Sequence, residues 1–307
     1  MKKLYKQISV RGINWFLVLL SILLVLTLCS CGAQTPVNYV FDDLGRLVAI
    51  NGTPQRIISL APSNTEILFA LGLGDKVVGV TNWCNYPPEA LNKTKVGDYA
   101  MPDIEKIAAL NPDLILAGYG NPIEVVYTLA GLGLTVFGIK TTDLNDLLND
   151  IRRIGEITDK EQEAAALTSE MASNIKAVTD VTSQLEERPR VFYMLWYDPL
   201  WTAGSETFIH ELIEKGGGVN ICQNLTGYPI IELEYVLACD PEIIITSVWC
   251  YDWALNATEL ESTTARQTNR VFTCNDDLVQ RPGPRLVKGL EWFAYFIHPE
   301  VFEEPED

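Results

Sequence analysis

The sequence is short of histidine and of basic residues, and each shortage argues against a class of protein. Its only two histidines, His210 and His298, stand far apart, whereas a zinc or manganese protein usually supplies several ligands. We therefore expect no metal site and a structural role for both. Lys and Arg number 23 against 40 Asp and Glu, which gives a net charge of −17 at pH 7. Such a chain repels nucleic acid and anionic lipid headgroups.

The motifs of common enzyme classes are also missing. The chain has no GxSxG elbow, no GxxxxGK[ST] loop and no complete GxGxxG. The run Gly216-Gly217-Gly218 is more typical of a helix stop than of a phosphate cradle. No nucleophile is paired with a base in any recognisable spacing, so we expect that the protein is not an enzyme and needs no cofactor.

Paired cysteine motifs are absent as well. None of the seven cysteines lies in a CxxC pair. An odd number follows Cys31, so at least one of these has no partner within the chain and no full disulfide framework is implied. They are Cys84, Cys222, Cys239, Cys250 and Cys274. Cys239 is expected to act as a small buried apolar residue.

The N-terminus has the pattern of a secretion signal. A basic stretch precedes the apolar run Trp15–Leu28, which is short for a membrane-spanning helix and typical of a signal peptide. The following LCSCG resembles a bacterial lipobox, in which Cys31 would be lipidated because the small Ser30 precedes it. The alternative is an uncleaved N-terminal anchor. In either case the folded part is expected outside the cytoplasmic membrane and attached to it only through this end.

The rest of the chain divides by pattern. A β-hairpin is predicted from Tyr39–Phe41 and Leu47–Ile50, and then a buried strand from Arg56 to Leu60. Ser63 or Asn64 is expected to cap the helix that follows. The predicted segments are a signal peptide (1–30), a tether with the hairpin (31–53), an N-terminal α/β lobe (54–142), a helical segment (143–187) and a C-terminal α/β lobe (188–307).

One unit occurs twice. Residues 103–118 read DIEKIAALNPDLILAG, and residues 232–247 read ELEYVLACDPEIIITS. Apolar residues at helical spacing open each copy, and a proline ends each helix. The apolar runs Leu114–Ala117 and Ile243–Thr246 are typical of strands buried on both faces. Each copy is therefore predicted to be a helix followed by a strand of a parallel sheet.

The segment between the two halves differs in character. Gly155 is the only glycine between 143 and 185, and apolar residues recur there every three or four positions. This predicts a long amphipathic helix of about 27 residues that starts near Asp159 as its cap. The plan is thus two α/β lobes joined by one helix. Ligands bind beyond the carboxyl ends of parallel strands, so the two lobes are expected to share a cleft.

Aromatic residues gather just past these predicted strand ends in both halves. They are Trp83, Tyr86, Tyr99, Tyr119, Trp196, Tyr197, Trp201, Tyr228, Trp249, Tyr251 and Trp253. Some are expected to pack under their own loops, but as a set they suit a large, weakly charged ligand. The last loop adds polar groups, which are Asp276, Asp277, Gln280 and Arg281. Arg281 and Arg285 fit ligand contact and salt bridges to neighbouring acids equally well.

Three stretches carry a family resemblance. RIISLAPSNTEILFALGLGDKVVGVTNWCNYPP, DIEKIAALNPDLILAG and RPGPRLVKGLEWFAYFIHPEVF resemble the substrate-binding proteins of ABC importers for cobalamin, ferric siderophores and haem. The resemblance covers roughly residues 39–303. It implies a class III binding-protein fold, with two Rossmann-like lobes joined by a single long rigid helix. It also implies a monomeric, non-enzymatic protein that delivers its ligand to a two-subunit permease driven by ATPase subunits.

Within that family the sequence around Trp83 looks most like the cobalamin-binding branch. The resemblance implies a corrinoid site formed by Trp83, Tyr99 and Tyr228, the turn at Pro62-Ser63, and Asp277 with Arg281. We add Tyr119, Trp196 and Trp249 to this expected ligand site. Leu278 and the extra tryptophans depart from the pattern and leave the exact corrinoid open. The alternatives are a ferric siderophore or haem as ligand, a sensor module on the same fold and, more remotely, a tethered enzyme.

The repeated unit places Glu105 and Glu234 at the same point of each copy, near the start of a helix. A glutamate there can simply complement the helix dipole. The family resemblance implies another role, in which one glutamate on each lobe docks into an arginine pocket on each permease subunit. A two-lobed protein that faces a two-subunit partner needs the same contact twice.

Overall fold

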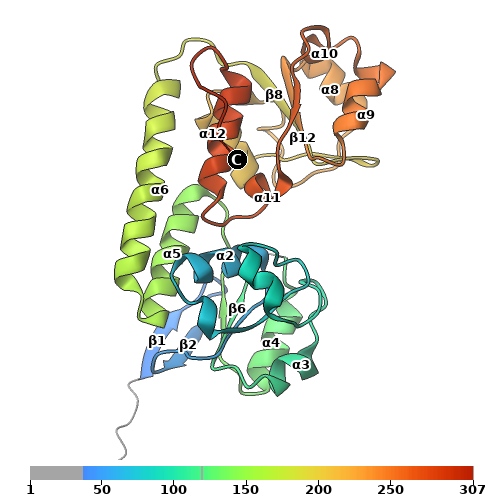
Figure 1. The fold of residues 1–307 in the computed structure, drawn as a ribbon. Helices are drawn as coiled ribbons and strands as arrows, with labels where there is room; N and C mark the ends of the chain where they lie inside the picture. The colour runs from blue at the N-terminus through green and yellow to red at the C-terminus, as the bar shows by residue number, and fades with distance from the viewer. Residues whose placement is uncertain (1–36, 119, 307) are drawn as a thin grey trace, which may run out of the picture. The chain divides into compact units, whose positions relative to one another are not determined.

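The computed structural model describes residues 37–118 and 120–306. The predicted signal peptide, Cys31 and Tyr119 lie outside these residues. Val37–Asp307 forms one unit, in which two α/β lobes are joined by helices (Figure 1). Within the described ranges, no helix is both long and apolar enough to cross a membrane.

The predicted hairpin forms at the start of the unit. Strands β1 (Val37–Phe41) and β2 (Leu47–Asn51) pair antiparallel. The buried Asp42 closes their turn, because its carboxylate accepts hydrogen bonds from the backbone N–H of Leu44 and Arg46 at 3.1 and 2.8 Å. Arg153 of the helical segment donates to the carbonyl of Phe41, which ties the hairpin to the rest of the unit.

The N-terminal lobe is built on a five-stranded parallel sheet in the order β5-β4-β3-β6-β7. The central strands are wholly buried, as expected for apolar runs covered on both faces. The strands are β3 (Ile57–Ser59), β4 (Val77–Val80), β5 (Thr94–Lys95), β6 (Leu114–Ala117) and β7 (Val136–Gly138). The helices are α2 (Pro62–Ala70), α3 (Ile104–Ala109) and α4 (Ile123–Gly131), with 3-10 turns η1 (Gly74–Lys76) and η2 (Pro88–Asn92).

The predicted cap of helix α2 is wrong. The helix begins at Pro62, earlier than expected, and its N-cap is Ala61, which makes no side-chain hydrogen bond to the helix end. Proline suits the first helical position because its fixed φ matches the helix and its missing N–H would be unpaired there. Ser63 and Asn64 therefore lie inside the first turn, where both are buried.

The helical segment consists of two helices. Helix α5 (Leu144–Thr158) ends at Asp159, which adopts a left-handed conformation with φ 61°, and α6 (Glu161–Thr182) follows. The expectation of one helix of about 27 residues capped by Asp159 is corrected accordingly, because this residue is the C-cap of α5. Gly155 lets the two helices approach closely, since a Cβ there would lie 2.5 Å from that of Ala164.

The C-terminal lobe has a four-stranded parallel sheet in the order β11-β8-β12-β13 and a two-stranded hairpin, β9-β10. The strands are β8 (Arg190–Met194), β9 (Trp196–Tyr197), β10 (Leu200–Trp201), β11 (Val219–Asn220), β12 (Ile243–Thr246) and β13 (Val271–Thr273). The helices are α7 (Phe208–Lys215), α8 (Leu233–Cys239), α9 (Tyr251–Asn256), α10 (Thr264–Gln267), α11 (Asp276–Val279) and α12 (Leu286–Ile297), with a 3-10 turn η3 (Thr258–Leu260).

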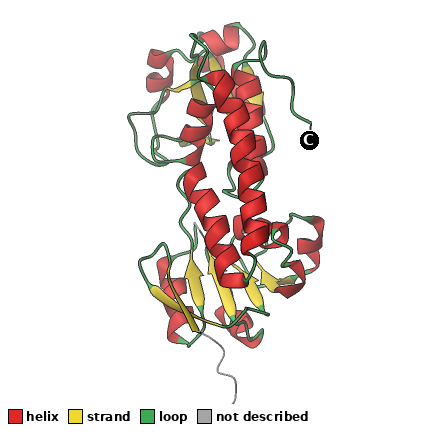
Figure 2. Ribbon diagram, turned by 90° about the vertical axis from the view of Figure 1, so that its left-hand side faces the viewer, coloured by secondary structure: helices red, strands yellow, loops and turns green. Residues whose placement is uncertain are grey.

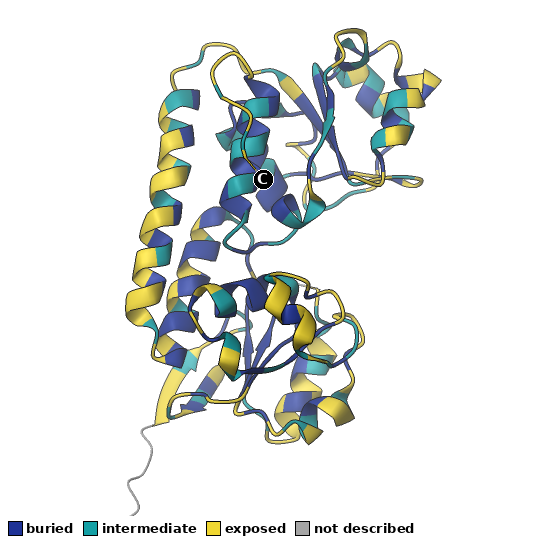
Figure 3. Cartoon of the chain, in the orientation of Figure 1, coloured by how far each residue is buried: buried dark blue, intermediate teal, exposed yellow. Residues whose placement is uncertain are grey.

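Helix α6 connects the lobes through apolar packing. Its buried residues Met171 and Val178 belong to one apolar cluster that includes strands of the N-terminal lobe and Phe293 of α12. Helix α6 contacts α5, α7 and α12, and Figure 2 shows the long helices that stand between the two sheets. Figure 3 shows that buried residues continue from one lobe through these helices into the other. The two lobes are therefore joined through a shared apolar core.

The repeated unit folds alike in both lobes, as predicted: α3 leads into β6, and α8 leads into β12. A left-handed residue follows each helix: Asn111, with φ 46°, comes just after the C-cap of α3, and Asp240, with φ 44°, is the C-cap of α8. An arginine that precedes or opens the neighbouring strand donates to two carbonyls at each helix end, Arg56 in one lobe and Arg190 in the other. This matching pair of arginine contacts could not be predicted from the repeated motif.

The cysteines after Cys31 are free thiols. Cys84 is buried in the N-terminal lobe, where the Thr65 hydroxyl lies 3.1 Å from its sulfur. Cys222, Cys250 and Cys274 are buried in the C-terminal lobe. Cys239, predicted to be buried, is only partly so.

Candidate functional site

A cavity of about 460 Å³ lies between the two lobes. It is bounded by the start of α2 and three loops of the N-terminal lobe, and by α11 and two loops of the C-terminal lobe. The lining residues are Ala61, Pro62, Ser63, Trp83, Tyr99, Gly120, Trp249, Asp276, Asp277, Gln280, Arg281 and Pro282. Six of the nine residues expected to bind ligand are therefore brought together: Ser63, Trp83, Tyr99, Trp249, Asp277 and Arg281.

The N-terminal wall is aromatic and braced. Trp83 follows β4 and is 55 % exposed, and its indole N–H donates to Asp98 Oδ2 at 2.6 Å. Tyr99 is 40 % exposed, and its carbonyl accepts a hydrogen bond from Asn121 Nδ2 at 2.7 Å. Gly120 passes close to this ring, since a Cβ there would lie 3.2 Å from it. Two rings thus stay open to solvent while hydrogen bonds hold their loops in place.

The C-terminal wall carries a third exposed ring. Trp249 follows β12 and is 75 % exposed. Its loop is fastened to α11, because Asp276 Oδ1 accepts the backbone N–H of Val248 at 3.2 Å. Burial raises the pKa of Asp276, and the nearby Asp277 adds to this rise. Large aromatic surfaces without a partner on both walls are typical of a ligand site.

The polar floor of the cavity joins the lobes. The Arg281 guanidinium lies 2.7 Å from Asp277 Oδ1 and donates to Asn85 Oδ1 at 2.6 Å and to the carbonyl of Trp83 at 3.3 Å. Asn85 in turn donates to Asp277 Oδ2 at 3.1 Å. The loop that carries Trp83 is therefore fastened directly to the opposite lobe.

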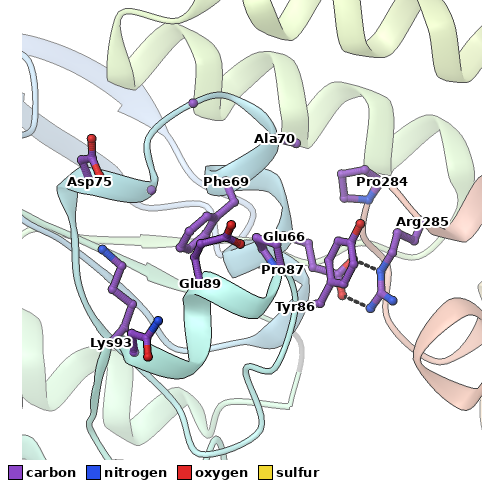
Figure 4. Close-up of a pocket in the computed structure, with 13 residues that line it drawn as sticks. Glu66, Phe69, Ala70, Asp75, Tyr86, Pro87, Glu89, Lys93, Pro284 and Arg285 are labelled. Carbon is purple, nitrogen blue, oxygen red and sulfur yellow. Dashed lines mark hydrogen bonds and ion pairs between the residues drawn. The ribbon is translucent and has the colours of Figure 1, made fainter.

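A second ion pair lies beside this floor. Arg285 donates to both carboxylate oxygens of Glu66 on α2, from Nε at 2.9 Å and from Nη2 at 2.6 Å. Its guanidinium also lies 3.8 Å from the centre of the Tyr86 ring. These groups border a second cavity of about 760 Å³ on the flank of the lobe junction (Figure 4). The salt-bridge interpretation of Arg285 therefore describes this structure, and sequence reasoning did not find its partner Glu66.

Two of the predicted ligand residues lie elsewhere. Trp196 belongs to the β9-β10 hairpin, where its indole N–H donates to the carbonyl of Asp198 at 2.9 Å and its ring stacks on Tyr197. Tyr228 packs edge-on against Phe208 beside the core. Neither lines the cavity. Both follow the aromatic-loop pattern, which cannot distinguish a ring that faces a ligand from one that stacks on a neighbour.

The two repeated glutamates occupy equivalent exposed positions. Glu105 lies in the first turn of α3, and Glu234 lies in the first turn of α8. Figure 1 shows α3 on one lobe and α8 on the other, both on the side away from α6. The N-cap Asp103 accepts the backbone N–H of Lys106 at 3.0 Å, so the helix end already has its capping carboxylate. Glu105 is thus not needed as the cap.

The two histidines have structural surroundings. His210 Nδ1 lies 3.3 Å from the Asn220 amide, and the buried His298 lies 3.2 Å from the carbonyl of Gly217. Across the part of the chain that the structure describes, no group of three or more His, Cys, Asp or Glu is placed to hold a metal ion.

The chain is similar in sequence and in structure to several known proteins. The model of the periplasmic binding protein family matches residues 57–278. An uncharacterised ABC transporter substrate-binding lipoprotein of Bacillus subtilis is 34% identical over 86% of each chain. A vitamin B12-binding protein of Vibrio parahaemolyticus is 34% identical over 80% of this chain and 90% of its own. The crystal structure of the periplasmic vitamin B12-binding protein of Vibrio cholerae has a TM-score of 0.72 and 30% identity, covering 81% of this chain and 98% of its own.

Proposed function

This chain belongs to the periplasmic binding protein family, and we propose that it captures a corrinoid such as cobalamin outside the membrane and delivers it to an ABC importer permease. Members of the family are non-enzymatic solute-binding components of importers, and the two-lobed class III fold predicted from the sequence is confirmed. The relatives that are named for vitamin B12 or cobalamin support the corrinoid assignment.

The observation that carries the proposal is the set of three exposed rings on opposite walls of one cavity, Trp83, Tyr99 and Trp249. Exposed indole and phenol rings bind large, flat, apolar surfaces well, and a corrin macrocycle offers such surfaces. A corrinoid also carries peripheral carboxamides, whose N–H groups can donate to carboxylates. Asp276 and Asp277 line the cavity, and their carboxylates are able to accept such bonds.

The alternative ligands fit the cavity less well. Anionic ferric siderophores are usually bound by several free arginines, but Arg281 and Arg285 are each paired with a carboxylate. Haem needs an axial ligand, and Tyr99 lines the cavity. Haem is therefore the second candidate, and an absorbance spectrum of the purified protein would reveal its Soret band.

Titration with cyanocobalamin tests the main proposal. We expect a saturable calorimetric signal with one ligand per chain and a ligand-dependent rise in the melting temperature, because a ligand that binds only the folded state stabilises it. The absence of both effects, with folded protein shown by circular dichroism, would overturn the corrinoid assignment. A Soret band in the purified protein would favour haem instead.

We further propose that Glu105 and Glu234 dock to the permease and that lipidated Cys31 tethers the protein, which would act as a monomer. The exposure of both glutamates at the same point of a repeated helix supports the first part. The relative named as a lipoprotein supports the second. Mass spectrometry of the membrane fraction tests the tether, because an unmodified Cys31 in the mature protein would contradict it.

A further inference from the structure

The carboxylate of Glu66 is the most deeply buried charge at the lobe junction. The residue is 3 % exposed, and it lies on α2 one turn after Pro62 and Ser63, which line the ligand cavity. It does not line that cavity itself. Burial raises the pKa of Glu66, and the hydrogen bonds from Arg285 oppose this rise. A buried carboxylate is costly unless it is paired, so its place calls for an explanation in terms of its partners.

Its partners are the two arginines of the loop before α12. Arg285 binds both oxygens of Glu66 in the forked geometry that suits a guanidinium. Arg281, which does line the cavity, lies 3.7 Å from Glu66 Oε1 and 2.7 Å from Asp277 Oδ1. Gly283 between them makes room, since a Cβ there would lie 3.1 Å from Glu66 Oε2. Figure 4 shows the Glu66 and Arg285 side chains meeting beside the Tyr86 ring.

The charge balance of this cluster follows. Among the described residues at the junction, Glu66 pairs with Arg281 and Arg285, and Asp277 pairs with Arg281. Asp276 adds a third carboxylate to the lining of the cavity. The acids therefore outnumber the bases by one, and the cavity repels anions. If Glu66 were neutral, the remaining charges would balance and Arg285 would lose its partner.

We propose that Glu66 is a specificity-determining residue: it neutralises the junction arginines from behind the cavity wall and so makes the cavity select ligands without negative charge. It does this without touching the ligand. The choice of ligand pair below rests on the proposed corrinoid function, but the effect on charge preference does not. If a ligand carboxylate lies about 10 Å from the charge on Glu66, at an effective dielectric constant near 20, removing that charge changes the affinity for the ligand on the order of tenfold.

The test compares two ligands of nearly the same shape, cyanocobalamin and a monocarboxylic acid derived from it by hydrolysis of one side-chain amide. We expect the wild-type protein to bind cyanocobalamin more tightly than the monocarboxylic acid. Glu66→Gln should reduce this ratio of affinities on the order of tenfold, chiefly because it binds the acid more tightly. The double variant Glu66→Gln with Arg285→Gln should restore the wild-type preference, because it removes one charge of each sign. High salt should reduce the difference between the affinity ratios of the wild type and Glu66→Gln, because it screens the charges.

Glu161→Gln is the matched control, because it removes one carboxylate from the exposed start of α6. It should leave the preference unchanged. A merely structural defect in Glu66→Gln would weaken the binding of both ligands equally and leave the ratio of their affinities as in the wild type. That result would overturn the proposal. A double variant that keeps the narrowed preference would also overturn it. If the wild-type protein binds neither corrinoid, the proposed function fails and the same ratio is measured with haem and its uncharged dimethyl ester.

Discussion

Replacing Trp249 by alanine should weaken corrinoid binding about 25-fold. A tryptophan side chain offers roughly 150–250 Å² of surface, and Trp249 is 75 % exposed, which leaves about 150 Å² open. A flat ligand that covers one face of the ring removes about half of this from water. At about 25 cal/mol per Å², the lost burial is about 2 kcal/mol, which corresponds to a factor of about 25 in the dissociation constant.

Isothermal titration with cyanocobalamin measures this change directly. Trp196→Ala is the matched control, because Trp196 is also a partly exposed loop tryptophan, at 41 %, but does not line the cavity. We expect its affinity for the ligand to equal that of the wild type. A loss of less than about threefold for Trp249→Ala, or an equal loss for Trp196→Ala, would refute the assignment of the aromatic walls as the binding surface.

Three further predictions concern docking, pH and packing. Glu105→Ala combined with Glu234→Ala should spare ligand binding and abolish uptake in cells, and normal uptake would contradict the docking role. Burial raises the pKa of Asp150 to about 7, with the nearby Asp43 adding to the rise and Thr141 and Arg153 opposing it. Between about pH 4 and pH 7, the folded protein therefore keeps a proton on Asp150 that the unfolded chain releases. The free energy of unfolding should fall as the pH rises through this range. Asp150→Asn should flatten this decline in the free energy of unfolding, as measured by urea denaturation at a series of pH values. An unchanged slope against pH would contradict this role of Asp150. Gly155→Ala should lower the free energy of unfolding by about 1–3 kcal/mol, because its Cβ would meet Ala164. Gly131→Ala, at the open end of α4, should lower it little. Equal losses in the two variants would argue against the close approach of α5 and α6.

The strands and the repeated unit could be predicted because their signals are local. Leu114–Ala117 and Ile243–Thr246 are continuous apolar runs, and both form wholly buried strands. Helix ends were harder to predict. Asp159 looked like an N-cap, but as a left-handed residue it ends the preceding helix instead. Composition alone cannot show which of two abutting helices a polar residue belongs to.

The site was partly predictable for a similar reason. The position of an aromatic residue after a strand brings it to the correct sheet edge, which applies to Trp83 and Trp249. The direction of the ring depends on contacts that the pattern does not contain. The pattern therefore does not reveal that Trp196 and Tyr228 pack on neighbouring rings. Glu66 was missed because its partners lie more than two hundred residues away in sequence.

The free thiols give each lobe a natural reporter of local opening. A thiol reacts with a labelling reagent as the exposed thiolate, and burial raises the pKa of Cys222 to about 11 and that of Cys274 to about 12. Labelling of these cysteines, and of the buried Cys84 in the other lobe, therefore requires the surrounding structure to open first. Peptide-resolved labelling kinetics would time the opening of each lobe in the unmodified protein. A ligand held by both lobes would slow the two reactions together.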